Sequence, residues 1–306
     1  MTLILAMLLD AAVGEPKALY NRVPHPAVLM GRLIGWADDR FNQGEDPKSD
    51  RRRNGIATML ALAIGALILG KLLAALGPLV EILVLAALLA QRSLVDHVRD
   101  VGNALRLSEG DGRMMVARIV GRDTSEMDGP AISRAAIESA AENFSDGVIA
   151  PIFWFALLGL PGLLLYKITN TADSMIGYRT ERHREFGWAA ARFDDLLNLA
   201  PARLTAVLIA LTHQVFHNWP LLVRDARQHR SPNAGWPEAA MARALDVALS
   251  GPRSYEGEMR DFPFVNVDGT HEATPDHIDA ACSALWRVWS VVLGLALLLS
   301  MLASVI

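Results

Sequence analysis

Residues 147–166 read GVIAPIFWFALLGLPGLLLY, twenty residues without a charge, and this stretch decides the fold class. Its length suits one membrane crossing, which takes about 20 apolar residues. Four residues that break or bend helices interrupt it, namely Pro151, Gly159, Pro161 and Gly162. A single crossing would also put the arginine-rich residues 167–202 outside the cell, against the positive-inside tendency. We therefore predict a re-entrant helical hairpin over 147–166, turning near Gly159–Gly162, a backbone shape that is tolerated where protein buries it.

Further apolar runs on both sides of this stretch predict an all-α, multi-pass integral membrane protein. Gly77-Pro78 separates the apolar residues 54–76 from 79–95, so residues 54–95 predict a transmembrane hairpin. Arg51-Arg52-Arg53 comes directly before the hairpin, and three arginines beside a helix end place that end in the cytoplasm. Residues 288–306 are nineteen uncharged residues that predict a C-terminal transmembrane helix.

The N-terminal segments are less apolar, and we treat residues 1–306 as one membrane-embedded domain. Residues 1–36 predict a partly embedded helix followed by a loop ordered by prolines. Gly31 and Gly35 form a pair of small residues that allows close helix packing. Residues 37–53 are interpreted as a polar linker.

The C-terminal half mixes polar and apolar segments. Residues 96–203 are expected to form the catalytic core, and 199–216 form a short apolar element at its end. Residues 217–283 have soluble character. Within them a helix is predicted from Pro237-Glu238 to Gly251-Pro252.

Composition excludes several classes of protein. The chain is 52% hydrophobic and 20% charged, and its formal net charge of −4 shows no basic signature, so nucleic acid is not an expected partner. Cys282 is the single cysteine and cannot form an internal disulfide. A cleavable signal peptide is not expected, because residues 1–9 lack a basic start and Asp10 interrupts the apolar run.

An acidic helix face precedes the central hairpin. Asp128-Gly129-Pro130 predicts a helix start, with the aspartate as N-cap. Glu138, Glu142 and Asp146 follow at i, i+4 and i+8, with Asn143 beside them. Carboxylate oxygens are ligands that Mg²⁺ prefers. A solvated helix face is the alternative interpretation of the same pattern.

Two groups of acids and amides follow the hairpin at helical spacing: Asn170, Asp173 and Ser174 with Arg179 beside them, and Asp194 and Asp195 with Asn198. Two such groups suit the two sides of a magnesium-nucleotide or magnesium-diphosphate site, because metal ions neutralise phosphate charge. Helix capping or interhelical hydrogen bonding is the alternative role for any one of these residues.

Cationic candidates for phosphate binding lie on both sides of the hairpin. Arg122, Asp123 and Thr124 stand at an expected helix start, where backbone N–H groups favour anions and an arginine matches phosphate geometry. Arg192 and Arg203 are further candidates. A plain N-cap, or simple ion pairs, would explain the same residues without a ligand.

Taken together, five motifs resemble the CobD/CbiB family of cobalamin biosynthesis. They are Arg122-Asp-Thr-Ser125, the stretch from Glu138 to Asp146-Gly147, Asn170-Thr-Ala-Asp-Ser-Met-Ile-Gly-Tyr-Arg179, Ala191-Arg-Phe-Asp-Asp-Leu-Leu-Asn-Leu-Ala-Pro-Ala-Arg203, and Ser231-Pro-Asn-Ala-Gly-Trp-Pro-Glu238. The resemblance runs in order from Asp10 to Pro252. Residues 37–53 and the last fifty residues carry little of it.

The resemblance implies a multi-pass enzyme of the cell inner membrane, adenosylcobinamide-phosphate synthase, with its active-site loops facing the cytoplasm. Such an enzyme is an ATP-dependent amide ligase that uses Mg²⁺. It would join a propionate carboxylate of the corrinoid adenosylcobyric acid to (R)-1-amino-2-propanol or to its O-phosphate. Membrane lipid is an implied partner, and a homo-oligomer or a complex with other enzymes of the cobalamin pathway is left open.

With that reaction in view, roles are expected for the polar residues. The catalytic set is Glu138, Glu142, Asp146, Asp173 and Asp195. The expected metal ligands are Glu142, Asp146, Asp173 and Asp194. Substrate and phosphate groups are expected to contact Arg122, Asp123, Thr124, Asn143, Asn170, Ser174, Arg179, Arg192, Asn198, Arg203, Asn233, Trp236 and Glu238.

Two rival functions fit parts of the same pattern. A membrane prenyl- or phospho-transferase also places acid-rich helices around magnesium diphosphate, and activity with an isoprenoid diphosphate would favour it. A non-catalytic membrane paralogue, a sensor or transporter, would bind an anionic ligand through its polar groups. Corrinoid-dependent turnover of ATP would exclude the second rival.

Overall fold

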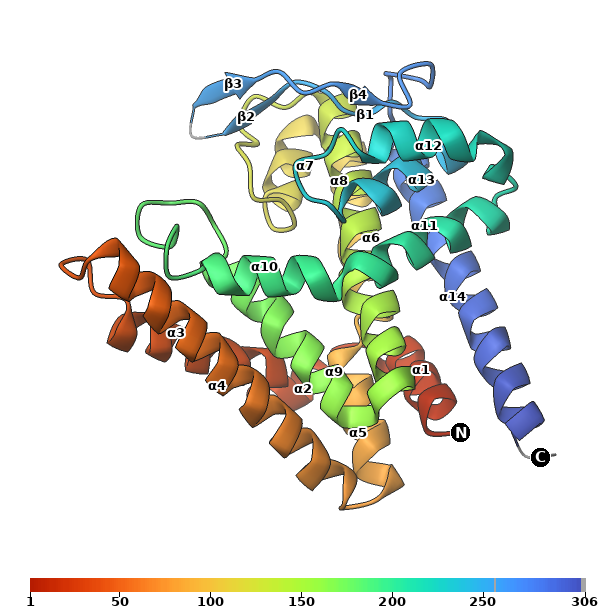
Figure 1. Cartoon of the computed structure of the whole chain (residues 1–306). Coiled ribbons are helices and arrows are strands. Elements are labelled where there is room, and N and C mark those ends of the chain that lie inside the picture. The colour runs from red at the N-terminus through yellow and green to blue at the C-terminus, as the bar shows by residue number, and fades with distance from the viewer. Residues whose placement is uncertain (256, 304–306) are drawn as a thin grey trace. The chain divides into compact units, whose positions relative to one another are not determined.

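The computed structural model describes residues 1–255 and 257–303 and is helical along most of the chain (Figure 1). Its contacts divide the chain into two compact units. The first unit comprises residues 1–90 and 146–199, and the second comprises 91–145 and the residues from 200 onward. Both units are interrupted in sequence, because residues 91–145 leave the first unit and the chain re-enters it at Asp146.

Helices of the first unit are α1 (Thr2–Val13), α2 (Lys17–Tyr20), α3 (Pro26–Phe41), α4 (Lys48–Ala74), α5 (Pro78–Leu88), α9 (Ala150–Ile176) and α10 (Trp188–Leu197). A short π-helix, η1 (Ser145–Ile149), leads into α9. Helix α9 packs on α3, α4, α5 and α10 and so forms the centre of this unit. Its buried core includes Tyr166, Leu163 and Leu160.

The predicted helical hairpin is confirmed within α9. At Gly159 the backbone adopts φ 65° and ψ −153°, a conformation that favours glycine and breaks the helix. The chain then reverses, since the hydroxyl of Tyr166 lies 3.1 Å from the backbone oxygen of Asp146. Each arm rises about 20 Å, less than the roughly 30 Å of a hydrocarbon core. That the hairpin re-enters a membrane stays a prediction.

Close backbone packing explains several glycines of the first unit. A Cβ added to Gly70 of α4 would lie 2.5 Å from Cα of Pro161, so α4 and the hairpin touch through their backbones. Gly31 of α3 faces the Met175 sulfur, which would lie 3.3 Å from an added Cβ. The expected close packing at Gly31 is therefore confirmed, and the partner is α9.

Two segments of the N-terminal half differ in detail from the prediction. The polar linker expected over 37–53 is helical at both ends, since α3 continues to Phe41 and α4 begins at Lys48. The second arm expected over 79–95 is broken, because Leu89 is extended with φ −81° and ψ 154°. Directly after it, the Ala90 N–H donates to the carbonyl of Gly147 at 3.1 Å. No glycine or proline marks this break, because its hydrogen-bond partner comes from a distant part of the chain.

Helices of the second unit are α6 (Gln91–Leu107), α7 (Glu109–Val116), α8 (Gly129–Phe144), α11 (Leu199–Thr212), α12 (Trp219–Ala226), α13 (Gly235–Leu245) and α14 (Pro275–Ala303), with a 3₁₀ turn, η2, at Phe216–Asn218. Helix α8 packs against α6, α7, α13 and α14. Its predicted start is confirmed, because Asp128 Oδ1 accepts a hydrogen bond from the Ala131 N–H at 2.8 Å.

Residues 246–265 of the second unit depart from the prediction. Helix α13 ends at Leu245, well before Gly251-Pro252, because Asp246 turns into the left-handed region with φ 54°. Two antiparallel pairs follow: β1 (Leu249–Ser250) with β4 (Phe264–Val265), and β2 (Arg253–Tyr255) with β3 (Glu258–Arg260). In register, Ser250 pairs with Phe264 and Arg253 pairs with Arg260. Strands this short bury little alternating surface, so the sequence carried no strand signal.

Among the described residues, four helical segments are long and apolar enough to cross a membrane: Lys48–Ala74, Pro78–Leu107, Gly129–Ile176 and Pro275–Ala303. A fifth is counted if Trp188–Leu197 and Leu199–Thr212 together form one span. The multi-pass membrane class is therefore confirmed. Helix α14 contains the C-terminal span predicted over 288–306, whose residues 304–306 lie outside the described part of the chain.

Candidate functional site

The predicted site residues divide between the two units. The first unit contains Asp146, Asn170, Asp173, Ser174, Arg179, Arg192, Asp194, Asp195 and Asn198. The second contains Arg122, Asp123, Thr124, Glu138, Glu142, Asn143, Arg203, Asn233, Trp236 and Glu238. The expected acidic face is thereby split, because Glu138 and Glu142 lie in α8 whereas Asp146 lies in η1.

A buried and half-buried network of acids and amides lies in the first unit. Asp194 of α10 is 8% exposed, and its Oδ1 accepts a hydrogen bond from Asn170 Nδ2 at 3.3 Å. Its Oδ2 accepts one from Asn198 Nδ2 at 3.0 Å. The Asn170 amide also lies 3.4 Å from Oδ2 of Asp146. A buried carboxylate is costly unless donors satisfy it, and the two amides supply them. We call Asp146, Asn170, Asp194 and Asn198 the Asp194 network.

Tyr166 ties this network to the hairpin. It is fully buried, and its hydroxyl lies 3.1 Å from Asn198 Oδ1 and 3.1 Å from the backbone oxygen of Asp146. Asp146, Asp194 and Asp173 are all close enough to act on the hydroxyl electrostatically. A buried tyrosine needs a hydrogen-bond partner. Its place at the polar end of the uncharged stretch was the one signal in the sequence that pointed to it.

The donor set of the Asp194 network fits a magnesium ion in part. Asp146 and Asp194 are held together by one amide, and carboxylate and amide oxygens suit this ion. No group of three or more His, Cys, Asp or Glu side chains within residues 1–255 and 257–303 could hold a metal by itself. Magnesium usually keeps several waters and binds one or two carboxylates together with substrate phosphates. The network could therefore supply two of its ligands.

A pocket of about 520 Å³ lies in the same unit and is rich in arginine. Its lining residues are Arg52, Gly177, Tyr178, Arg179, Arg184, Glu185, Trp188, Ala191, Arg192 and Asp195. We call it the arginine pocket. Three residues predicted from the sequence, Arg179, Arg192 and Asp195, meet here. Arg192 Nη1 lies 3.8 Å from Asp195 Oδ2, a long and exposed ion pair.

The second unit buries an ion cluster around Glu138. The Glu138 Oε2 lies 2.8 Å from Arg122 Nη2 and 3.2 Å from Arg253 Nη1, and Oε1 accepts a hydrogen bond from the Ser250 N–H at 2.8 Å. Side chains of all three charged residues are at most 13% exposed. A shared carboxylate between two buried guanidinium groups holds β1 and β2 against α8. Arg122, expected to contact phosphate, is thus paired with Glu138, expected to be catalytic.

Glu238 lies beside this cluster on α13. It is 5% exposed, and its Oε1 has no hydrogen-bond partner among the described residues. Burial, and then the negative charge of Glu138, raise the pKa of Glu238 to about 8. Its Oε2 lies 3.8 Å from Nε2 of His229. Since the His229 Nδ1 accepts a hydrogen bond from the Ser231 N–H, the neutral ring carries its proton on Nε2, toward Glu238.

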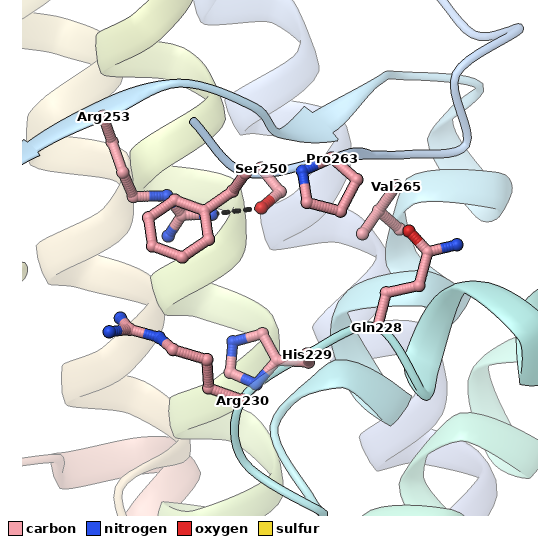
Figure 2. Close-up of a pocket in the computed structure, with 8 residues that line it drawn as sticks. Gln228, His229, Arg230, Ser250, Arg253, Pro263 and Val265 are labelled. Atoms are coloured by element: carbon pink, nitrogen blue, oxygen red, sulfur yellow. Dashed lines mark hydrogen bonds between the residues drawn. The ribbon is translucent and has the colours of Figure 1, made fainter. Parts of the chain in front are cut away.

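A shallow pocket of about 20 Å³ opens beside His229 (Figure 2). Figure 2 shows Arg253 entering it from β2, and Arg230 and His229 entering from the loop after α12. Arg253 donates a hydrogen bond to the Ser250 hydroxyl, drawn as a dashed line. Both guanidinium groups also lie over the Phe262 ring, at 4.9 Å for Arg230 and 5.2 Å for Arg253. None of these residues was predicted from the sequence as a site residue.

Arg203, Asn233 and Trp236, all expected at the site, meet in the second unit. Arg203 Nη1 donates to Asn233 Oδ1 at 3.1 Å, and its guanidinium carbon lies 4.6 Å from the Trp236 ring centroid. Gly235 allows this arrangement, because an added Cβ would lie 2.4 Å from the carbonyl oxygen of Ala226. Two residues of the Ser231–Glu238 motif, Asn233 and Trp236, therefore contact Arg203 of the preceding motif.

Asp123 and Asn143, also predicted from the sequence, have local hydrogen-bond partners. Asp123 Oδ2 accepts hydrogen bonds from the Ser254 hydroxyl at 2.8 Å and from the Gly257 N–H at 2.7 Å. These bonds lower the pKa of Asp123 and attach its loop to the β2–β3 strands. Asn143 is exposed and donates to the carbonyl of Ser139 at 2.9 Å. Thr124 is half-buried near the same loop.

The chain matches a family model described as CobD/Cbib protein over residues 3–285. It is 48% identical to the cobalamin biosynthesis protein CobD of Sinorhizobium sp, covering 98% of both chains. The protein of the same name from Brucella suis biovar 1 is 46% identical, covering 98% of this chain and 96% of that one. The one from Rhodobacter capsulatus is also 46% identical, covering 86% of each. No solved structure matches the chain.

Proposed function

The chain belongs to the CobD/Cbib protein family, and from that premise we propose that it is the adenosylcobinamide-phosphate synthase of cobalamin biosynthesis. The relatives are named as cobalamin biosynthesis proteins, and the family match covers most of this chain. The proposed reaction joins a propionate carboxylate of adenosylcobyric acid to (R)-1-amino-2-propanol or its O-phosphate, with hydrolysis of ATP. The proposed location is the cell inner membrane, with the active-site loops in the cytoplasm.

The chemistry of amide formation sets what the site must supply. A carboxylate does not react with an amine until it is activated. In the proposed sequence the carboxylate oxygen attacks the γ-phosphorus of ATP, which forms an acyl phosphate and releases ADP. The neutral amine then attacks the acyl carbon, inorganic phosphate leaves, and the proton lost by the amine passes to a base. The site therefore needs phosphate-binding cations, a means to neutralise phosphate charge, and a proton acceptor.

The observation that carries the proposal is the Asp194 network. Its members were predicted from three separate motifs, and the fold joins them by hydrogen bonds of 3.0 to 3.4 Å. Asp146 and Asp194 would hold Mg²⁺ together with phosphate oxygens of the nucleotide. When bound there, the ion would neutralise phosphate charge during transfer. Asp194 and Asn198 are buried, and amides satisfy the carboxylates of the network, so these carboxylates are held in position before a ligand arrives.

Glu238 supports the proposal as a proton acceptor. Its pKa of about 8 lets this carboxyl gain or lose a proton near neutral pH, as a general base should. Glu138 is less suited to that role, because two arginines and a backbone N–H already occupy its oxygens. Within the second unit, Glu138 holds Arg122 and Arg253 in place, and Glu238 is the carboxyl suited to exchange a proton.

The proposal is tested with detergent-purified protein, adenosylcobyric acid, ATP, Mg²⁺ and each form of the amine, with mass spectrometry of the corrinoid. We expect a mass gain that matches the amide and is absent without ATP. Protein with an intact thermal transition that makes no product from either amine would refute the proposed reaction. An isoprenoid diphosphate supplied in parallel tests the transferase rival.

A further inference from the structure

We propose that the arginine pocket of the first unit binds the polyphosphate chain of a nucleoside triphosphate, with Arg52 and Arg184 as ligand contacts beside Arg179 and Arg192. Neither Arg52 nor Arg184 was predicted from the sequence to contact a ligand. That the nucleotide is ATP rests on the proposed function, whereas the affinity for polyphosphate rests on the pocket itself.

The four arginines come from separate parts of the chain. Arg52 lies in the first turns of α4, Arg179 and Arg184 lie in the segment between α9 and α10, and Arg192 lies in α10. A run of charges along one helix usually marks a solvated face. Here three separate segments place arginines around one cavity, and solvation of a single helix face does not account for that arrangement.

The charges of the lining residues favour an anion. Four arginines stand against two acids, Glu185 and Asp195, which leaves an excess of two positive charges. Guanidinium groups bind phosphate oxygens in pairs of parallel hydrogen bonds. The Arg192–Asp195 pair is 3.8 Å long and its arginine side chain is 62% exposed, so it contributes little by itself. A phosphate group can therefore replace it at small cost.

Arg52 is held in place by an aromatic ring. Its guanidinium carbon lies 4.0 Å from the centroid of the Trp188 ring. A guanidinium over an aromatic face is attracted by the ring electrons, and its N–H groups remain available at its edge. The neighbouring arginines have other tasks: Arg51 is buried against Asn42 at 2.8 Å, and Arg53 pairs with Asp50 at 3.4 Å. Of these three consecutive arginines, Arg52 is the one that lines the pocket.

The segment that carries Arg179 and Arg184 is clamped to α3 and α4. Arg182 donates to Asp38 Oδ2 from Nε at 2.9 Å and from Nη2 at 2.7 Å. Arg51 donates to the backbone carbonyls of Glu181 and Arg182. A Cβ on Gly187 would lie 1.6 Å from the carbonyl oxygen of Ile176, so the segment packs directly on the end of α9. The pocket is therefore formed before a ligand arrives, which lowers the entropic cost of binding.

The size of the pocket separates a polyphosphate from a single phosphate. Its volume of about 520 Å³ falls within the roughly 300–1,000 Å³ of small-molecule sites. A lone phosphate would leave most of that volume empty. Tyr178, 59% exposed, and Trp188, 38% exposed, add aromatic surface on which a nucleobase can stack.

The test is direct binding of a non-hydrolysable ATP analogue to the full-length protein in detergent, by calorimetry. The variants are Arg52→Gln and Arg184→Gln, and the matched control is Arg53→Gln, whose side chain is 77% exposed and does not line the pocket. Loss of one charge-assisted phosphate contact should raise the Kd about tenfold. Arg53→Gln should bind as the unmodified protein does. Pyrophosphate should compete with the analogue, and adenosine should not.

Two results would overturn the proposal: unchanged affinity in both pocket variants, or competition by adenosine but not by pyrophosphate. Amide formation, assayed in the same preparations, separates this proposal from the proposed function. If the unmodified protein forms the amide but Arg52→Gln and Arg184→Gln bind the analogue normally, the proposed reaction stands and the pocket proposal fails. If the unmodified protein forms no amide but both variants bind the analogue more weakly, the pocket proposal stands and the proposed reaction fails.

Discussion

Arg182 donates two hydrogen bonds to one carboxylate oxygen of Asp38, at 2.9 Å and 2.7 Å. The contact joins the segment before α10 to α3 and so fixes one wall of the arginine pocket. Burial by itself raises the pKa of Asp38, but hydrogen bonds from Asn42, Arg182 and His183 outweigh it and lower the pKa below its usual value. The ionised carboxylate is therefore the form that the fold stabilises.

Asp38→Asn should loosen this wall. The amide cannot accept charge-assisted hydrogen bonds, each of which contributes about 1.5–3 kcal/mol. We expect a lower apparent Tm in detergent and weaker binding of the ATP analogue. Asp39→Asn is the matched control, because the Asp39 side chain is 82% exposed although it also pairs with Arg182 at 3.1 Å. Equal effects of the two variants would contradict the role given to Asp38.

The lowered pKa of Asp38 predicts that the protein loses stability in acid. A group with a lowered pKa contributes stability above its unfolded pKa, near 4, and this contribution is lost as pH falls through the folded value. The apparent Tm of the unmodified protein should therefore fall more steeply below about pH 4 than that of Asp38→Asn. Parallel curves for the two proteins would show that Asp38 does not set the acid limit.

Glu238 predicts the opposite pH dependence. Because its pKa is raised to about 8 in the folded protein, the unfolded chain releases the proton first, and stability falls as pH rises from about 4.3 toward the folded value. Glu238→Gln keeps the neutral form and should flatten the decline of apparent Tm between pH 5 and 8. Glu126→Gln, at an exposed position, is the control and should leave the slope unchanged. A slope that persists in Glu238→Gln would exclude this carboxyl as its source.

Gly70 and Gly65 lie on the same helix and should respond oppositely to alanine. A Cβ at Gly70 would lie 2.5 Å from Pro161 Cα, a backbone atom that cannot move alone, so Gly70→Ala should destabilise the protein by about 1–3 kcal/mol. At Gly65 nothing lies within 4 Å of an added Cβ. There alanine should stabilise the helix by up to about 1 kcal/mol. Thermal unfolding in detergent measures both changes, and destabilisation by Gly65→Ala would contradict this packing.

The Asp194 network predicts a change in metal dependence. Asp194→Asn keeps the shape but removes one proposed magnesium oxygen, so the Mg²⁺ concentration for half-maximal amide formation should rise by about tenfold or more. Asp39→Asn serves again as the control. An unchanged Mg²⁺ requirement together with reduced turnover would show that Asp194 is a structural acid that does not bind the metal.

Local features of the sequence determined much of the fold. Apolar runs predict helices and spans, because lipid forces each backbone group to find a partner within its own segment. Gly159 adopts a positive-φ conformation open almost only to glycine at the predicted turn, and Asp128 caps α8 as its short side chain allows. Arg179, Arg192 and Asp195 were predicted from their motifs as site residues, and the fold brings them to one pocket.

Tertiary structure decided what depends on partners far along the chain. The break before Gln91 needs the carbonyl of Gly147, and the end of α13 and the short strands depend on contacts of Asn266 and Glu138 with distant backbone groups. Arg52 reaches the pocket only because α4 packs beside Trp188. Helix periodicity reports which face of a segment is apolar and leaves open what that face meets. Which arginine is buried, paired or aimed at a cavity is set by long-range packing, and no local pattern records it.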